Sequence, residues 1–301
     1  MSTPNRPAGR SGILLLDKPQ GPTSHDLVSR TRRVMGTRKV GHAGTLDPMA
    51  TGLMILGVES STRLLTHLVG LDKEYTATIR LGEATDTDDA EGQVVSTADA
   101  SALADAAIAA AIEPLTGDIQ QVPSSFSAIK VDGRRSYDRA RAGESVELAA
   151  RPVRVDAFEV LAARRGTATL DLDVRVAVSS GTYVRALARD LGSALGVGGH
   201  LTALRRTRVG PFEVADAVAP DADLPAALLP PAGVARRLFP AVELDAASAV
   251  ALAHGKRVPL PTPDAPIVAA IGPGDRLAGL VAVKGGVARV LVNFPTEEVL
   301  S

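Results

Sequence analysis

Short apolar segments, most of them ended by glycine or proline, recur along the whole chain. Continuous or alternating apolar runs predict β-strands at residues 12–19, 53–58, 73–81, 117–123, 153–162 and 167–179. Segments of helical character, some with a capping residue in front, predict helices at residues 27–35, 62–68, 101–112 and 137–142 and a further helix capped by Thr182. No apolar run reaches the roughly 20 residues needed to cross a membrane. Because no secretory leader precedes these segments, we expect a cytoplasmic protein.

The pattern changes in the last quarter of the chain. Residues 216–231 are rich in alanine, proline and aspartate, which indicates a partly helical connector. Beyond a boundary near Pro240, a helix at 246–255 and three short alternating runs with glycine turns predict a small β-rich domain. We therefore expect a flexible N-terminus at 1–11, a main domain at 12–215, a connector at 216–239 and a second domain at 240–301.

Composition excludes several kinds of site. The 301 residues include no cysteine, which rules out disulfides and thiolate metal ligands. The five histidines are scattered without the spacing of a metal site, and the sequence contains no nucleotide-binding loop, so we expect no metal and no cofactor. Net charge is −1, but the charges are segregated into three basic groups and separate acidic ones. Charge alone favours a solvated surface for each group, although a segregated surface can still bind phosphate locally. The basic groups are 30–39, 130–141 and 205–208, and an acidic turn spans 85–92.

One glycine-rich loop stands out chemically. It reads Gly41-His42-Ala43-Gly44-Thr45-Leu46-Asp47-Pro48-Met49-Ala50-Thr51-Gly52-Leu53 and runs directly into an apolar strand. Asp47 is its only carboxylate, and Pro48 favours an extended backbone at the residue before it. The glycines permit positive φ or close backbone approach. An isolated Asp-Pro is usually a simple turn, whereas loops on rigid strands also carry reactive groups.

This loop resembles the catalytic signature of the TruB family of tRNA pseudouridine synthases, which convert uridine 55 of the tRNA T-loop to pseudouridine. Further segments resemble the family's other motifs in the same order, so the likeness covers about residues 11–213. These segments are Lys18–Ser24, Lys73-Glu74-Tyr75, Pro123–Lys130, Gly181-Thr182-Tyr183-Val184-Arg185 and Leu204–Phe212. The resemblance implies an α+β pseudouridine-synthase fold, in which helices flank a central, mostly antiparallel mixed sheet. The tail at 240–301 resembles a PUA-type RNA-binding domain.

The same resemblance implies roles for individual residues. Asp47 would be the catalytic carboxylate, Tyr75 would stack on the target base, and Arg185 would pair with Asp47. An arginine in the first turn of a helix is opposed by the helix dipole, and a nearby carboxylate would offset this unfavourable interaction. Asp47 is the expected partner, and Asp190 or solvent is the alternative. The residues implied to bind or support the substrate are His42, Lys18, Tyr183, Leu204 and Lys130.

Without the resemblance, ordinary structural roles compete with each of these assignments. Tyr75 and Leu204 would then be packing residues, Lys18 a surface residue at a strand end, and His42 a ligand of the loop backbone. Tyr75 is also one candidate for the general base that removes the C5 proton. Two other functions remain open: a nucleoside or glycoside hydrolase using Asp47, and a non-catalytic tRNA chaperone. We expect a monomer that acts on the T-stem-loop of tRNA without a guide RNA.

Overall fold

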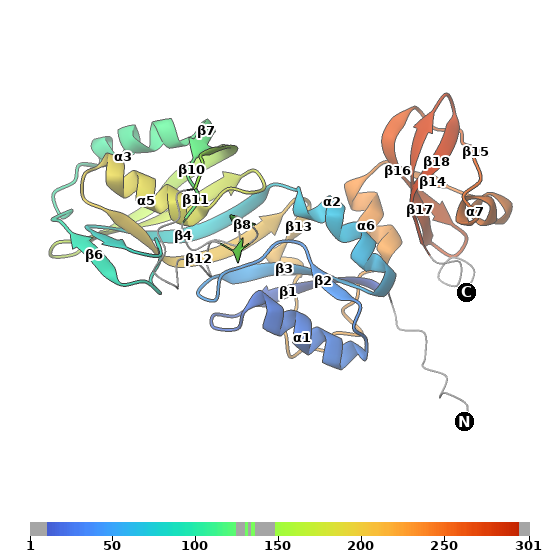
Figure 1. Ribbon diagram of the computed structural model, residues 1–301, viewed down its shortest axis with the longest axis horizontal. Coiled ribbons are helices and arrows are strands. Elements are labelled where there is room, and N and C mark those ends of the chain that lie inside the picture. Colours follow the sequence, from blue (N-terminus) through green and yellow to red (C-terminus); the bar gives the residue numbers. More distant parts are fainter. Residues whose placement is uncertain (1–10, 125–129, 132–133, 136–147, 295–301) are drawn as a thin grey trace.

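The computed structural model describes residues 11–124, 130–131, 134–135 and 148–294. They form two large β-sheets, joined by helical segments at the centre of the molecule, and two small two-stranded sheets (Figure 1). The helix expected at 137–142, most of the motif at 123–130 and the N-terminal segment 1–10 lie outside the described residues. Within the described part, no helix is long and apolar enough to cross a membrane.

The larger sheet has nine strands and forms the N-terminal half of the molecule together with its helices (Figure 1). Its main path runs β1-β3-β12-β4-β11-β10-β7, with β2 beside β3 and β13 beside β12. Only the β3–β12 pairing is parallel, which confirms the mostly antiparallel mixed sheet. The strands are β1 (Gly12–Lys18), β2 (Val40–His42), β3 (Thr51–Val58), β4 (Lys73–Leu81), β7 (Gly117–Gln121), β10 (Arg151–Arg165), β11 (Leu170–Val178), β12 (Gly199–Val209) and β13 (Phe212–Glu213).

Helices cover this sheet at both ends. Helix α1 begins with a reciprocal capping box between Thr23 and Asp26. It ends at Gly36, which adopts the left-handed conformation. The helices of this half are α1 (Ser24–Met35), α2 (Leu65–Val69), α3 (Asp105–Ile112) and α5 (Val184–Ala194). Single 3₁₀ turns occupy Glu59–Leu64, Glu113–Leu115 and Val214–Asp216, and two small hairpins pair β5 (Glu83–Thr85) with β6 (Val94–Thr97) and β8 (Lys130–Val131) with β9 (Arg134–Arg135).

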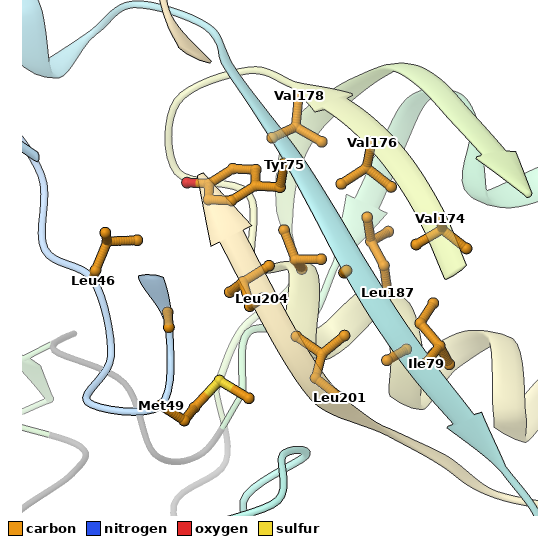
Figure 2. Close-up of a cluster of buried hydrophobic side chains, with 14 of the residues drawn as sticks. Leu46, Met49, Tyr75, Ile79, Val174, Val176, Val178, Leu187, Leu201 and Leu204 are labelled. Atoms are coloured by element: carbon orange, nitrogen blue, oxygen red, sulfur yellow. The ribbon is translucent and has the colours of Figure 1, made fainter. Parts of the chain in front are cut away.

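Strand β4 shows how the sequence pattern sets the core. Its burial alternates along all nine residues, as the period of a half-buried strand requires. Tyr75 and Ile79 therefore face the core together with Val174 and Leu204 from neighbouring strands (Figure 2). Glu74 points to the other face, where it pairs with Arg175. The core thus ends in a tyrosine at the edge nearest the Asp47 loop (Figure 2).

The second sheet is a five-stranded unit near the C-terminus, in the order β14-β16-β17-β18-β15. Residues between the two sheets do not form an isolated linker, because Val218 and Leu229 both bridge to β1 and helix α6 follows. Apolar residues of β1, β3, α6 and the second sheet share one core. The elements are α6 (Pro231–Leu238), β14 (Ala241–Glu243), α7 (Ala246–Ala253), β15 (Val258–Pro259), β16 (Ala265–Gly272), β17 (Arg276–Lys284) and β18 (Val287–Asn293).

Candidate active site

A buried lysine holds the backbone of the Asp47 loop in place. Lys18 lies at the end of β1 and is fully buried. Its Nζ donates to the carbonyls of Pro48 at 3.0 Å and Ala50 at 2.6 Å, and to that of Pro19 at 3.1 Å. Three carbonyl acceptors satisfy the three ammonium protons. The structure therefore contradicts a surface position for Lys18 and shows that this residue supports the active-site loop through its backbone carbonyls.

Arg206 on β12 holds the same loop from the other side. This side chain is 1% exposed, and its guanidinium donates to the carbonyls of Leu53 at 2.7 Å and of Thr45 and Gly44 at 3.3 Å each. Where β3 passes β12, a Cβ at Gly52 would lie 2.2 Å from the Arg206 carbonyl oxygen, so only glycine fits.

The third basic group is accordingly committed to internal contacts. Arg205 pairs with Asp17 at 2.7 Å, and Arg208 donates to the carbonyl of Gly210 at 3.0 Å. The interpretation of this group as a solvated surface is wrong for Arg206, which is buried and holds neighbouring backbone carbonyls.

Arg185 meets Asp47 as expected. Its Nε lies 3.1 Å from Asp47 Oδ2, and the arginine side chain is only 6% exposed. Arg185 occupies the first turn of α5, although Tyr183 and not Thr182 is the N-cap residue. Thr182 Oγ1 instead donates to the carbonyl of Ser179. The alternative partner, Asp190, pairs with Arg189.

A second carboxylate also pairs with Arg185. Asp89 Oδ2 lies 3.3 Å from Nη1, and the Thr87 carbonyl accepts a hydrogen bond from the same nitrogen at 3.1 Å. Asp89 is 3% exposed and accepts from Thr87 Oγ1 and the Glu91 N–H. The prediction of a solvated acidic turn at 85–92 is therefore wrong at its centre. Buried acids are stable here because each faces an arginine from α5, and Asp88 faces Arg189 at 3.4 Å.

Asp47 and Arg185 open into a cavity of about 270 Å³. The size suits one small ligand. Its walls combine aromatic, apolar and charged groups, and Asp47 is the only carboxylate among the described residues that line it. The Tyr75 hydroxyl is directed toward the side on which Leu46 lies (Figure 2). The principal lining residues are Leu46, Asp47, Lys73, Tyr75, Tyr183, Arg185 and Leu204.

Burial dominates the electrostatics of Asp47. It raises the pKa of this carboxyl above its ordinary value, and the nearby Asp89 charge raises it further. Arg185 and Lys18 lower this pKa, but the effect of burial outweighs them. Solvent reaches 39% of the side chain through the cavity. The site thus holds a carboxylate that a bound base would desolvate further.

Some of the remaining predicted residues line this cavity and others do not. Tyr75, Leu204 and Tyr183 line it. His42 ends β2 directly before the loop, and burial followed by the charge of Arg206 lowers the pKa of its imidazole. Its buried Nδ1 has no hydrogen-bond partner among the described residues, but a backbone hydrogen bond with Gly44 partly offsets the lowering of its pKa, so the imidazole keeps a contact with the loop backbone. The side chain of Lys130 lies outside what the structure describes.

Sequence reasoning missed two charged residues that hold this site: Asp89, which pairs with Arg185, and Arg206, which holds the Asp47 loop. Asp89 stood in an acidic run and Arg206 in a basic run, and both runs were interpreted as solvated surface. Neither residue has a local sequence signal that separates it from a solvated charge, because its partners come from distant segments. Among the described residues, no cluster of histidine, aspartate or glutamate could hold a metal ion.

Comparison with known proteins identifies the family. The model of the TruB family pseudouridylate synthase N-terminal domain matches residues 32–184. Models described as the tRNA pseudouridylate synthase B C-terminal domain and as the tRNA pseudouridine synthase II C-terminal region match residues 185–229 and 239–295.

Curated relatives and solved structures agree with these matches. The tRNA pseudouridine synthase B of Leifsonia xyli subsp. xyli is 56% identical over 296 residues, covering 96% of this chain and 98% of that protein. Its namesake from Nocardia farcinica is 60% identical over 247 residues, covering 81% of each chain. A Cbf5-Nop10-Gar1 complex contains a chain with a TM-score of 0.70 and 27% identity, covering 96% of this chain and 87% of that one. The chain belongs to the TruB family of pseudouridylate synthases.

Proposed function

We propose that this enzyme isomerises uridine 55 in the T-loop of tRNA to pseudouridine, with Asp47 as the catalytic carboxylate. One observation carries the proposal. Asp47 faces a cavity of about 270 Å³ lined by Tyr75 and Leu204, and Arg185 holds it at 3.1 Å. The curated relatives that cover nearly the whole chain are named tRNA pseudouridine synthase B, which supports the tRNA substrate.

The reaction breaks the N1–C1′ bond of uridine, turns the base and joins C5 to C1′. C5 loses a proton and N1 gains one, so the product is an isomer and no oxidant or energy source is required. Asp47 acts as a nucleophile or stabilises positive charge at C1′. Tyr75 lies in the same cavity and is the candidate that we propose for accepting the C5 proton.

A base inside a folded loop must leave its stack before it can reach such a cavity. We propose that the ring of Tyr75 stacks on the extruded uracil and that Leu204 contacts it from β12, since both line the cavity. His42 is proposed to fill the vacated space in the RNA. A lowered pKa keeps its imidazole neutral near pH 7, which suits stacking between bases.

The hydrolase alternative requires a second carboxylate at the reacting bond. Asp47 is the only one among the described lining residues, and Asp89 lies behind Arg185 at 3% exposure. Glu74 points to the opposite face, where it pairs with Arg175. Isomerisation therefore fits the cavity better than hydrolysis.

We also propose that the enzyme acts as a cytoplasmic monomer on tRNA alone. Solved relatives include a chain of an H/ACA RNP bound to a substrate RNA, with a TM-score of 0.70 and 25% identity over 96% of this chain and 86% of that one. The curated bacterial relatives are named for tRNA, which supports action without a guide RNA.

The test is direct incubation of the purified protein with an unmodified T-stem-loop RNA and no other component. Pseudouridine at the position of uridine 55, mapped by chemical modification and primer extension, is the expected result. Free uracil with an abasic RNA would instead indicate hydrolysis. Tight binding with unchanged RNA would indicate a chaperone.

A further inference from the structure

A glutamine from the edge of the large sheet holds the N-terminus of α5. Gln121 is the last residue of β7 and is fully buried. Its Oε1 accepts a hydrogen bond from the Tyr183 N–H at 2.8 Å, and its Nε2 donates to the Tyr183 carbonyl at 3.1 Å. Tyr183 is the N-cap residue of α5, and its own side chain makes no capping hydrogen bond. The glutamine amide therefore binds the helix N-terminus from outside the helix.

The two hydrogen bonds hold the N–H and the carbonyl on either side of the Tyr183 Cα, so they fix the position and the direction of the backbone at this residue. A primary amide offers a donor on one side and an acceptor on the other, and a buried amide needs partners for both. The Tyr183 carbonyl also accepts from the Leu187 N–H at 3.2 Å, which is a bond of the first helical turn. Gln121 thereby links the first turn of α5 to the sheet.

That first turn carries two groups of the proposed active site. Tyr183 lines the cavity, with the Arg151 guanidinium 4.9 Å from its ring centre. Arg185 stands two residues further and reaches Asp47 at 3.1 Å. A small rotation of the turn would move both groups together.

A second contact from the same segment holds the other end of Arg185. Ser124 is fully buried, and its Oγ donates to the Thr87 carbonyl at 3.3 Å. That carbonyl also accepts from Arg185 Nη1 at 3.1 Å. The end of β7, through Gln121, thus contacts the backbone before Arg185. Ser124, three residues further, contacts a carbonyl that accepts a hydrogen bond from the Arg185 guanidinium.

We propose that Gln121 is a positioning residue of this enzyme, acting through the Tyr183 peptide to place Arg185 against Asp47. Gln121 is absent from the cavity lining, so it does not touch the base. The inference rests on the proposed synthase function, because its readout is the rate of isomerisation. A purely packing role would require only the volume of the side chain and not its amide.

Two substitutions separate the amide from the volume. Gln121→Met keeps the length but removes both hydrogen bonds. Gln121→Glu keeps the acceptor for the Tyr183 N–H but sets a carboxylate against the Tyr183 carbonyl. Protonation of that glutamate restores a donor and an acceptor, and burial beside a carbonyl raises its pKa. The matched controls are Gln120→Met and Gln120→Glu, because Gln120 is exposed on the same strand.

Single-turnover rates at saturating enzyme and Kd values for the T-stem-loop RNA are measured between pH 8 and pH 6. We expect Gln121→Met to slow the reaction about 10- to 100-fold while Kd changes less than about threefold. We expect the rate ratio of Gln121→Glu to wild type to rise as pH falls. Both Gln120 variants should follow the wild type at every pH.

Three results would overturn the inference: a normal rate for Gln121→Met, a loss confined to Kd, or a pH-independent ratio for Gln121→Glu. If Gln121→Met is too unstable to assay, the Gln121→Glu ratio decides alone, because its protonated form restores both bonds. A wild-type protein that makes no pseudouridine would refute the proposed function, a result distinct from normal activity in the variants.

Discussion

Arg185 Nε lies 3.1 Å from Asp47 Oδ2, and the arginine side chain that makes this contact is only 6% exposed to solvent. Nη1 of the same guanidinium faces Asp89 at 3.3 Å. One cation therefore lies between a carboxylate that opens to the cavity and one that does not. The position of the guanidinium thus depends on both carboxylates, so changes at Arg185 and at Asp89 should each affect Asp47.

Replacing Arg185 with lysine should slow isomerisation with little change in RNA affinity. A lysine ammonium is a point charge on a flexible stem, so it cannot meet Asp47, Asp89 and the Thr87 carbonyl with the fixed fork of a guanidinium. We expect a fall in single-turnover rate of at least about 10-fold, equivalent to about 1.4 kcal/mol in the barrier. Arg80→Lys is the control, because Arg80 makes a similar pair with Asp171 at the far end of β4. Unchanged turnover in Arg185→Lys would exclude a role for the guanidinium geometry.

Replacing Asp89 with asparagine should change both the rate and its pH dependence. The Asp89 charge raises the pKa of Asp47, so its removal should move the acid limb of the rate profile to lower pH. Loss of a charged acceptor for Arg185 should also reduce stability by about 2 kcal/mol. Asp86→Asn, in the same segment but exposed, is the control. An acid limb that stays in place or moves to higher pH would contradict the assigned interaction.

The lowered pKa of Lys73 predicts that the free energy of unfolding changes with pH in the alkaline range. Lys73 lines the cavity, and its Nζ donates to the Leu71 carbonyl at 2.6 Å and to Ser180 Oγ at 3.2 Å. Burial, followed by the charge of Arg206, lowers its pKa from 10.5 to about 8. Between these values the unfolded chain binds more protons than the folded one, so the contribution of Lys73 to stability rises with pH.

The measurement compares the free energies of unfolding of the wild type and Lys73→Met at pH 7 and pH 9.5. We expect the difference to shift in favour of the wild type by about 2 kcal/mol at the higher pH. Lys256→Met is the control, because Lys256 is exposed after α7. A constant difference would show that Lys73 has an ordinary pKa in the folded protein.

We expect changes in the second domain to alter RNA affinity without altering the rate of the chemical step. The sheet of this domain shares an apolar core with β1, β3 and α6, so deletion of residues 240–301 would expose that core as well as remove a binding surface. Charge reversal is therefore the cleaner change. Lys256 and Arg257 are exposed where α7 ends, and we propose that they bind phosphate.

Lys256→Glu with Arg257→Glu should weaken RNA binding and reduce the slope of log K against log salt by about one for each phosphate that the protein no longer neutralises. The neutral pair Lys256→Gln with Arg257→Gln should be intermediate. Single-turnover rates at saturating enzyme should stay near the wild-type value. A slower rate with unchanged affinity would place these residues in the chemistry instead.

The parts of the fold that the sequence predicts are those with local patterns. Strand β4 matches its predicted bounds because every second residue is buried, and α1 begins where its capping box stands. The Asp47–Arg185 pair was also predicted, because the two motifs resemble those of the family and a nearby carboxylate offsets the unfavourable position of an arginine at a helix N-terminus. Asp89 and Lys18 were not, because the partners that make their burial possible come from distant segments. Without knowledge of its partners, a charged residue in a sequence is interpreted as exposed to solvent. In the structure, Asp89 pairs with Arg185 of α5, and Lys18 donates to carbonyls of the Asp47 loop.

The central claim is that the carboxylate of Asp47 is needed for the chemistry and not for RNA binding. Asp47→Asn keeps the shape of the side chain but removes its charge and nucleophilicity, while Arg185 keeps Asp89 as a partner. The deciding measurement is single-turnover conversion of T-stem-loop RNA by Asp47→Asn, with Kd measured in parallel. We predict no pseudouridine above background and a Kd close to that of the wild type. Pseudouridine formation at a rate comparable to the wild type would contradict the mechanism.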